Sequence, residues 1–154
     1  MTIVADDDNT QSSQRLEVLI GRWITKGSTT DAVDTYERLP GGALLHLVDA
    51  QVEGQKVEGA EIIGYDPARG TYVTQYFGSD GPNAYEASLS ERDGALVWSM
   101  RSARDRFTGT FDDDRNVITG HWEALDDDSN WQPWMDITLT RDASADDRAA
   151  RTDE

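Results

Sequence analysis

From Trp23 onward, the chain alternates between short runs rich in β-branched and aromatic residues and shorter stretches of turn-forming residues. The runs cover residues 22–28, 32–39, 43–53, 56–65, 71–78, 83–91, 95–102, 104–111, 116–125 and 132–141. Runs of this length and composition, bounded by Gly, Pro and Asp, predict β-strands. Because links this short can join only neighbouring antiparallel strands, the pattern predicts a meander of about ten strands.

Hydrophobic and polar residues alternate within the later runs, which predicts one dry and one wet face. Leu96, Trp98 and Met100 share a face, and the opposite face carries Val97, Ser99 and Arg101, most of which should meet water. The same alternation places further residues on the dry face: Phe107, Gly109, Phe111, Ile118, Gly120, Trp122, Met135, Ile137 and Leu139. By the same rule Arg106, His121 and Trp134 face outward.

The pattern favours a closed barrel over a sandwich. An antiparallel meander has two exposed edges unless it closes on itself. We therefore predict an all-β fold: a closed antiparallel up-and-down β-barrel of about ten strands. Such a barrel is wider than the eight-stranded kind that side chains nearly fill, which predicts a ligand-sized cavity inside.

A short helix is expected before the first strand. Leu16, Leu19 and Ile20 recur at helical spacing, Ser12 or Ser13 can cap the helix, and Gly21 stands where a glycine would end it. Residues 1–11 and 142–154 are polar and charged, and we expect them to be disordered tails. The remaining residues, 12–141, form one domain, as the length of 154 residues allows.

Composition narrows the classes of function. The chain has no cysteine, which excludes disulfides, thiolate metal sites and a cysteine nucleophile. Thirty acidic and fourteen basic residues give a net charge of -16, which repels nucleic acid and anionic membrane surfaces, and we interpret this charge as a solubility feature. The chain begins without the pattern of a signal peptide and contains no apolar run long enough for a membrane span, so a cytoplasmic location is expected.

The start of the first strand resembles a known signature. Gly21-Arg22-Trp23 follows the predicted helix and is similar to the Gly-x-Trp motif of lipocalins and related calycins. Arg141, at the end of the last strand, resembles the basic residue that packs across this tryptophan at the base of those barrels. The resemblance implies that Trp23 and Arg141 are structural, with the guanidinium stacked on the indole.

Further segments resemble a bacterial lipocalin-like family of unknown function. The resemblance spans about residues 16–141 and rests on segments 35–42, 61–66, 106–109, 120–123 and 134–136, together with His46 and Asp49. The haem-binding nitrobindins are similar in architecture and strand number. Their proximal ligand is a histidine near the C-terminus, and no histidine follows His121 here, which argues against haem. No cofactor is expected.

Two polar residues in apolar runs are candidates for chemistry. His46 has apolar neighbours on both sides, so its face is ambiguous, and Glu61 shares a face with Ile63 and Tyr65. The hairpin formed by 43–53 and 56–65 brings His46 and Glu61 within reach of each other. In one interpretation the pair transfers a proton, with His46 as a base; in the other it is a buried structural pair.

Aromatic side chains supply the candidate pocket wall. Tyr76, Tyr85, Trp98 and Trp122 offer rigid rings, and two of the four carry a hydroxyl that can orient a ligand. Tyr65 and Met135 complete the candidate ligand-binding set. The alternative for each position is ordinary packing in the core.

Several catalytic and metal-binding motifs fail on their spacing. Asp126, Asp128 and Asn130 imitate an EF-hand, but its sixth position is Trp131 and its twelfth is Ile137, so we expect no calcium or other metal site. The chain also lacks a nucleophile elbow, a phosphate loop and a dinucleotide motif.

These observations leave three functional hypotheses. The first is a module that binds a small hydrophobic molecule, with His46 or Glu61 as the polar anchor. The second is a cofactor-independent cyclase or isomerase of specialised metabolism that uses the same pocket. The third is a haem protein of the nitrobindin kind. The sequence leaves the identity of the ligand open, and also whether the barrel forms a homodimer through an outer face.

Overall fold

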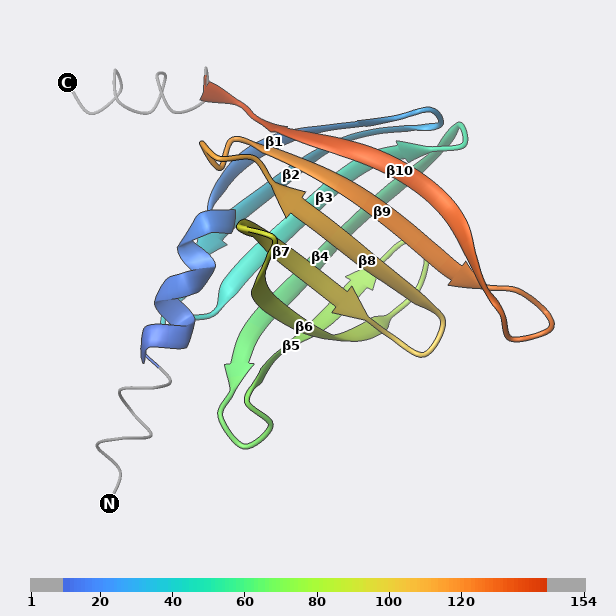
Figure 1. The fold of residues 1–154 in the computed structure, drawn as a ribbon. Helices are drawn as coiled ribbons and strands as arrows, with labels where there is room; N and C mark the ends of the chain where they lie inside the picture. Colours follow the sequence, from blue (N-terminus) through green and yellow to red (C-terminus); the bar gives the residue numbers. More distant parts are fainter. Residues whose placement is uncertain (1–9, 144–154) are drawn as a thin grey trace.

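A computed structural model of the chain, which describes residues 10–143, shows a closed antiparallel barrel of ten strands (Figure 1). Each strand pairs with its neighbours in sequence, and β1 pairs with β10 to close the barrel. The strands are β1 (Gly21–Gly27), β2 (Thr30–Arg38), β3 (Leu44–Val52), β4 (Gln55–Asp66), β5 (Thr71–Gly78), β6 (Asn83–Arg92), β7 (Ala95–Arg101), β8 (Asp105–Phe111), β9 (Val117–Leu125) and β10 (Trp131–Arg141). The predicted up-and-down barrel is confirmed.

Turn chemistry fixes the pairing of the strands. In the two-residue links β3–β4 and β6–β7, both residues have positive φ: 52° and 79° at Glu53 and Gly54, and 53° and 83° at Asp93 and Gly94. This conformation matches the twist of the flanking strands and is favoured by Asp-Gly and similar pairs. The hairpin of β3 and β4 therefore has the register that places His46 directly opposite Glu61.

The N-terminal helix differs in detail from its prediction. Residues 10–15 are α-helical and lead into the 3-10 helix η1 (Leu16–Leu19). The proposed cap at Ser12 or Ser13 is wrong, because the helix already includes Thr10 and both serines lie inside it. Most of the two predicted tails, residues 1–9 and 144–154, lies outside the described residues.

The helix covers one end of the barrel, which we call the helix end (Figure 1). Leu16, Leu19 and Trp23 are almost completely buried there, and the Trp23 indole N–H donates to the Leu19 carbonyl at 2.9 Å. Tyr72 reaches from inside the barrel to donate its hydroxyl to the Ser12 carbonyl at 2.7 Å. Apolar burial and these two hydrogen bonds thus join the helix to the barrel.

Arg141 closes the seam between β1 and β10, as the resemblance implies. It lies directly opposite Trp23 in the register, and its guanidinium carbon is 4.2 Å from the centre of the indole ring. The same guanidinium donates to the carbonyls of Ile20 and Val18, the latter at 2.9 Å. One side chain therefore ties the last strand to the first strand and to η1.

The alternation of faces is confirmed for most positions of the later strands. The predicted dry-face residues Trp98, Phe107 and Ile118 belong to the buried core, whereas Arg101 is exposed. Val97 lies on the outer face, because its neighbours Leu96 and Trp98 point inward, yet it is only 3% exposed. The two-residue periodicity predicts the face to which a side chain points, but it does not predict whether neighbouring side chains bury it.

Three large apolar side chains are exposed on the outer face of β3, β4 and β5. Leu47, Ile62 and Phe77 are 42%, 52% and 63% exposed. The expected homodimer through an outer face stays a prediction. Among the described residues, no helix is both long and apolar enough to cross a bilayer.

We predict that Arg141→Ala lowers the free energy of unfolding by about 2–4 kcal/mol, because the stacking on Trp23 and several charged hydrogen bonds are lost together. Urea denaturation measures the change. Arg22→Ala is the control, since Arg22 is half-exposed and forms an ion pair with Asp142 at 3.2 Å; its loss should stay within about 1 kcal/mol. Equal losses of stability in the two variants would contradict the role of Arg141 in closing the seam between β1 and β10.

Candidate ligand-binding site

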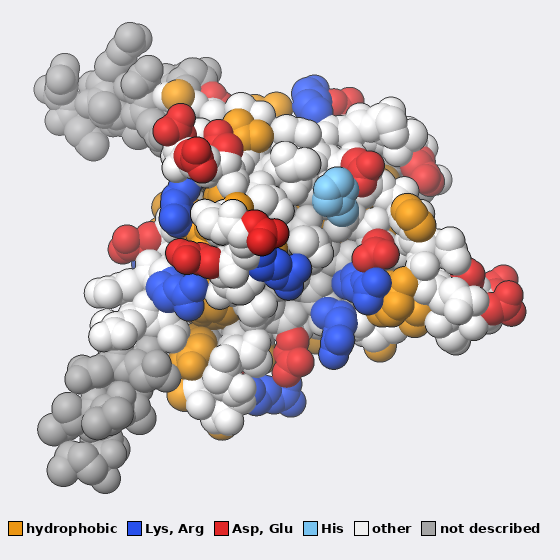
Figure 2. All heavy atoms as spheres, viewed as in Figure 1, with side chains coloured by type: hydrophobic (Ala, Val, Ile, Leu, Met, Phe, Trp, Pro, Cys, Tyr) orange, Lys and Arg blue, Asp and Glu red, His pale blue; other side chains and the backbone are white. Residues whose placement is uncertain are grey.

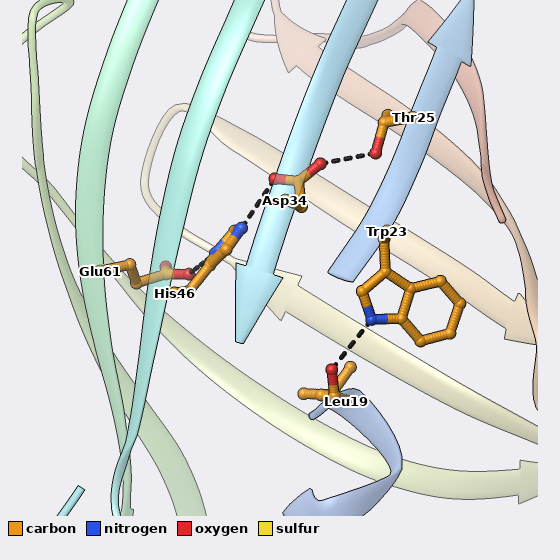
Figure 3. A network of polar contacts seen from close by, with 6 residues as sticks. All are labelled: Leu19, Trp23, Thr25, Asp34, His46 and Glu61. Atoms are coloured by element: carbon orange, nitrogen blue, oxygen red, sulfur yellow. Dashed lines mark hydrogen bonds and ion pairs between the residues drawn. The ribbon is translucent and has the colours of Figure 1, made fainter. Parts of the chain in front are cut away.

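A belt of polar side chains crosses the inside of five neighbouring strands. His46 on β3 faces inward, which settles the ambiguity left by its apolar neighbours. Its Nδ1 is 2.9 Å from Glu61 Oε1 on β4, and its Nε2 is 2.7 Å from Asp34 Oδ1 on β2 (Figure 3). The belt continues outward at both ends: Thr25 on β1 donates to Asp34 at 2.5 Å, and Thr74 on β5 donates to Glu61 at 2.8 Å.

The belt is buried and holds charge. The side chains of His46, Asp34 and Glu61 are 12%, 11% and 4% exposed. Burial alone would lower the pKa of His46, but hydrogen bonds and charge from Asp34 and Glu61 raise it to about 9. At neutral pH an imidazolium therefore lies between two carboxylates, and both of its N–H groups donate.

Tyr36 completes the belt from the direction of the helix end. Its ring lies parallel to the His46 imidazole, 4.0 Å away between ring centres. Burial, followed by the charges of Asp34 and Glu61, holds the pKa of the Tyr36 phenol well above its usual value. The tyrosine therefore stays neutral and covers one face of the imidazolium.

Asp34 and Tyr36 are parts of this belt that sequence reasoning missed. The available signal was the two-residue spacing of Asp34, Tyr36 and Ala32, which places a carboxylate on the same face as an aromatic ring. The registers of β2 with β3 and of β3 with β4 place Tyr36, His46 and Glu61 side by side across three strands.

The interior on the two sides of the belt differs. Toward the helix end, Leu44 and Ile63 are completely buried and Trp98 lies 5.8 Å from Tyr72 between ring centres. At the opposite end, which we call the open end, the inward-facing Trp122 and Met135 are only half-buried. The helix end is filled with side chains, and the open end is not.

Four aromatic rings meet at the open end. Trp122 contacts Tyr85, Phe107 and Trp134, with ring centres 6.2, 5.1 and 5.8 Å apart. Trp134 was expected to face outward. It lies at a β-bulge between Pro133 and Met135, where it has no partner in β9. Because a bulge changes the direction of a side chain, the Trp134 ring reaches Trp122, although it stays 47% exposed.

Tyr76 lies flat on the wall of the barrel at the same end. Gly59 and Gly78 are directly opposite each other on β4 and β5, and a Cβ atom on either glycine would collide with the Tyr76 ring. The Tyr76 hydroxyl donates to Asp80 at 2.7 Å on the β5–β6 link. The two glycines thus make room for one ring between the belt and the rim.

A hollow of about 310 Å³ lies at this open end. Its lining combines aromatic, small apolar and polar side chains: Tyr76, Asp80, Gly81, Asn83, Tyr85, Arg104, Asp105, Ala124, Leu125 and Trp134. Two larger hollows, of about 810 and 500 Å³, lie on the outer face of β4–β7 and of β6–β9. Neither His46 nor Glu61 lines any of the three.

The predicted ligand-binding residues fall into three groups along the barrel. Trp98 and Tyr65 lie with Tyr72 in the packed half. His46 and Glu61 form the belt. The remaining four lie toward the open end: Tyr76, Tyr85, Trp122 and Met135.

The hydrogen bonds of the two histidines decide whether either could bind a metal ion or haem iron inside the barrel. Both nitrogens of His46 are hydrogen-bonded, and His121 is exposed on the outer face with its Nδ1 2.7 Å from Asp136. Neither offers a nitrogen to an iron inside the barrel. Within residues 10–143, no cluster of three or more His, Asp or Glu side chains is suited to hold a metal ion.

The fold and this interior define a closed ten-stranded antiparallel barrel, consistent with a lipocalin-like protein. A search of protein-family models finds no match, and no curated protein is significantly similar to the chain in sequence. The resemblance to the bacterial family and to nitrobindins therefore stays a prediction.

We predict that the protein loses stability as the pH rises from about 6.5 to about 9. His46 has a pKa of about 9 in the folded chain and an ordinary value of 6.5 when unfolded. Its contribution is therefore complete below pH 6.5 and is lost as the pH rises through 9, with a total on the order of 3 kcal/mol. Urea denaturation across this pH range measures the loss.

The imidazole signals of His46 in an NMR titration provide the direct check, with exposed His121 as a reference in the same spectrum. Glu61→Gln keeps the shape of the belt but removes one charge, and should lower the His46 midpoint. A wild-type midpoint below pH 7, or no change in the variant, would show that the carboxylates do not hold the proton.

Proposed function

We propose that this protein binds a small, largely apolar molecule in the open end of the barrel. The observation that carries the proposal is the contrast between the two halves of the interior. Leu44 and Ile63 are completely buried toward the helix end, whereas Trp122, Tyr85 and Met135 face inward at the open end but are only half-buried. Accessible aromatic and apolar side chains in a concave site are typical of small-molecule binding.

The polar groups at the open end are few and fixed, as a ligand-binding site requires. Asn83 donates to the Tyr85 hydroxyl at 2.9 Å, and Ser102 donates to Asp105 at 2.6 Å. Glu61, directly opposite Tyr76 in the register, connects the belt to this region. Side chains held in this way can orient a ligand without first becoming ordered, which reduces the entropic cost of binding.

The size of the hollow favours a small ligand. A volume of about 310 Å³ lies at the lower end of the range for ligand sites, roughly 300–1,000 Å³. Rings of Tyr85 and Trp134 border it, so a bound molecule would contact aromatic surface on more than one side.

Binding is better supported than catalysis by the same pocket. A cyclase or isomerase needs an acid or base with a free site toward the substrate. The His46 imidazolium donates both of its protons to Asp34 and Glu61, and Tyr36 covers one of its faces. The arrangement favours a structural role for the pair over proton transfer.

We predict that Ala124→Phe abolishes or strongly weakens the binding of a neutral apolar dye such as Nile red. Ala124 lines the hollow at the open end, and a phenyl ring there would occupy the space that a ligand needs. A dye titration followed by fluorescence measures the affinity. The thermal unfolding midpoint should change little, because Ala124 is only half-buried.

Ala84→Phe is the matched control. Ala84 is exposed and lines the larger hollow on the outer face of β4–β7, so the same substitution there should leave dye binding unchanged. Loss of binding in Ala84→Phe but not in Ala124→Phe would place the dye on the outside of the barrel. Absence of dye binding to the wild type would contradict the proposed function.

A further inference from the structure

Two carboxylates, those of Asp80 and Asp105, line the hollow at the open end. Asp80 accepts from the Tyr76 hydroxyl at 2.7 Å, and Asp105 accepts from the Ser102 hydroxyl at 2.6 Å. The Tyr85 hydroxyl donates more weakly to Asp105, at 3.4 Å. Within residues 10–143 neither carboxylate forms an ion pair with a basic side chain.

The belt adds negative charge from beneath the hollow. Asp34 and Glu61 share a single imidazolium, which leaves one net negative charge inside the barrel. Arg104 also lines the hollow. The belt and the hollow together therefore hold two cations, His46 and Arg104, and four carboxylates: Asp34, Glu61, Asp80 and Asp105. The rim is also acidic, since Asp126, Asp127 and Asp128 occupy the β9–β10 link, where Figure 2 shows red side chains at the tip.

The phenols of the site respond to this charge. Burial and the charge of Asp105 raise the pKa of Tyr85. Burial, the hydrogen bond to Asp80 and the more distant charge of Glu61 raise the pKa of Tyr76. Burial is the largest cause for both phenols, and the nearby carboxylates act in the same direction. Carboxylates beside accessible aromatic rings favour a cation and disfavour an anion.

The ring faces add a second preference for positive charge. The π-electron faces of tyrosine and tryptophan attract ammonium groups, most strongly where water is partly excluded. Tyr85 and Trp134 border the same hollow as Asp80 and Asp105. A fatty acid or another carboxylate-bearing ligand would instead bring its charge toward the carboxylates of Asp80 and Asp105.

We propose that the ligand is an organic cation: an apolar body with a protonated amine or quaternary ammonium group beside Asp80 and Asp105. This inference rests on the proposed function, because it assumes that the open end is a binding site. It adds the chemical class of the ligand. The apolar body would lie against the rings of Tyr85 and Trp134, and the cation would remain near the rim.

Octylammonium, octanol and octanoate test the preference, since they share one apolar chain and differ in charge. Each is titrated against bound Nile red at low salt, and displacement gives its affinity. We expect octylammonium to bind about ten-fold or more tightly than octanoate, with octanol between them. The difference should shrink at about 1 M salt, where exposed charges are screened.

Asp105→Asn keeps an acceptor for Ser102 and removes the charge, and should weaken octylammonium about three-fold or more while leaving octanol unchanged. Asp113→Asn makes the same change in the exposed β8–β9 link at the helix end, and should affect neither compound. Equal affinities for the three octyl compounds, or tighter binding of octanoate, would overturn the cation preference alone. Failure of Nile red and of all three compounds to bind would overturn the proposed function as well.

Discussion

The interior of this protein exists only because β1 pairs with β10. Five residue pairs, from Trp23 opposite Arg141 to Gly27 opposite Ile137, join the two ends of the meander. Gly27 brings its backbone so close to Asp136 that a Cβ atom would collide with the carbonyl there. Without this seam the meander would keep two open edges and its apolar face would meet water. The stacking of Arg141 on Trp23 stabilises this seam at the helix end.

Closure creates a second requirement, because charges that face a dry interior must be neutralised or hydrogen-bonded. Asp34, His46 and Glu61 satisfy it together, with one threonine hydroxyl at each end of the row. Removing His46 would leave two buried carboxylates without the cation between them. The belt also divides the barrel into a filled half beneath the helix and an accessible half at the other end.

Much of the fold could be predicted from the sequence, and the reasons are local. All ten strands lie within two residues of their predicted bounds, because turn residues separate runs with a two-residue period. The hairpin of β3 and β4 also predicts the contact of His46 with Glu61. Asp34 was missed although it lies only 12 residues from His46 and on the same face as Tyr36. The bulge at Trp134 was not predicted, because strict alternation along the strand cannot show where one residue has no partner. The position of the hollow was not predicted either. It depends on which part of the barrel is filled by side chains, and the two-residue periodicity contains no information on that.

The Tyr76 ring rests on Gly59 and Gly78, so the shape of the accessible half depends on two positions that have no side chain of their own. A Cβ atom on either glycine would collide with the ring. Because the ring also lines the hollow and its hydroxyl is held by Asp80, a larger residue at position 59 or 78 would displace both the wall and its anchor. Two glycines in the wall of the barrel thus determine the outline of its interior.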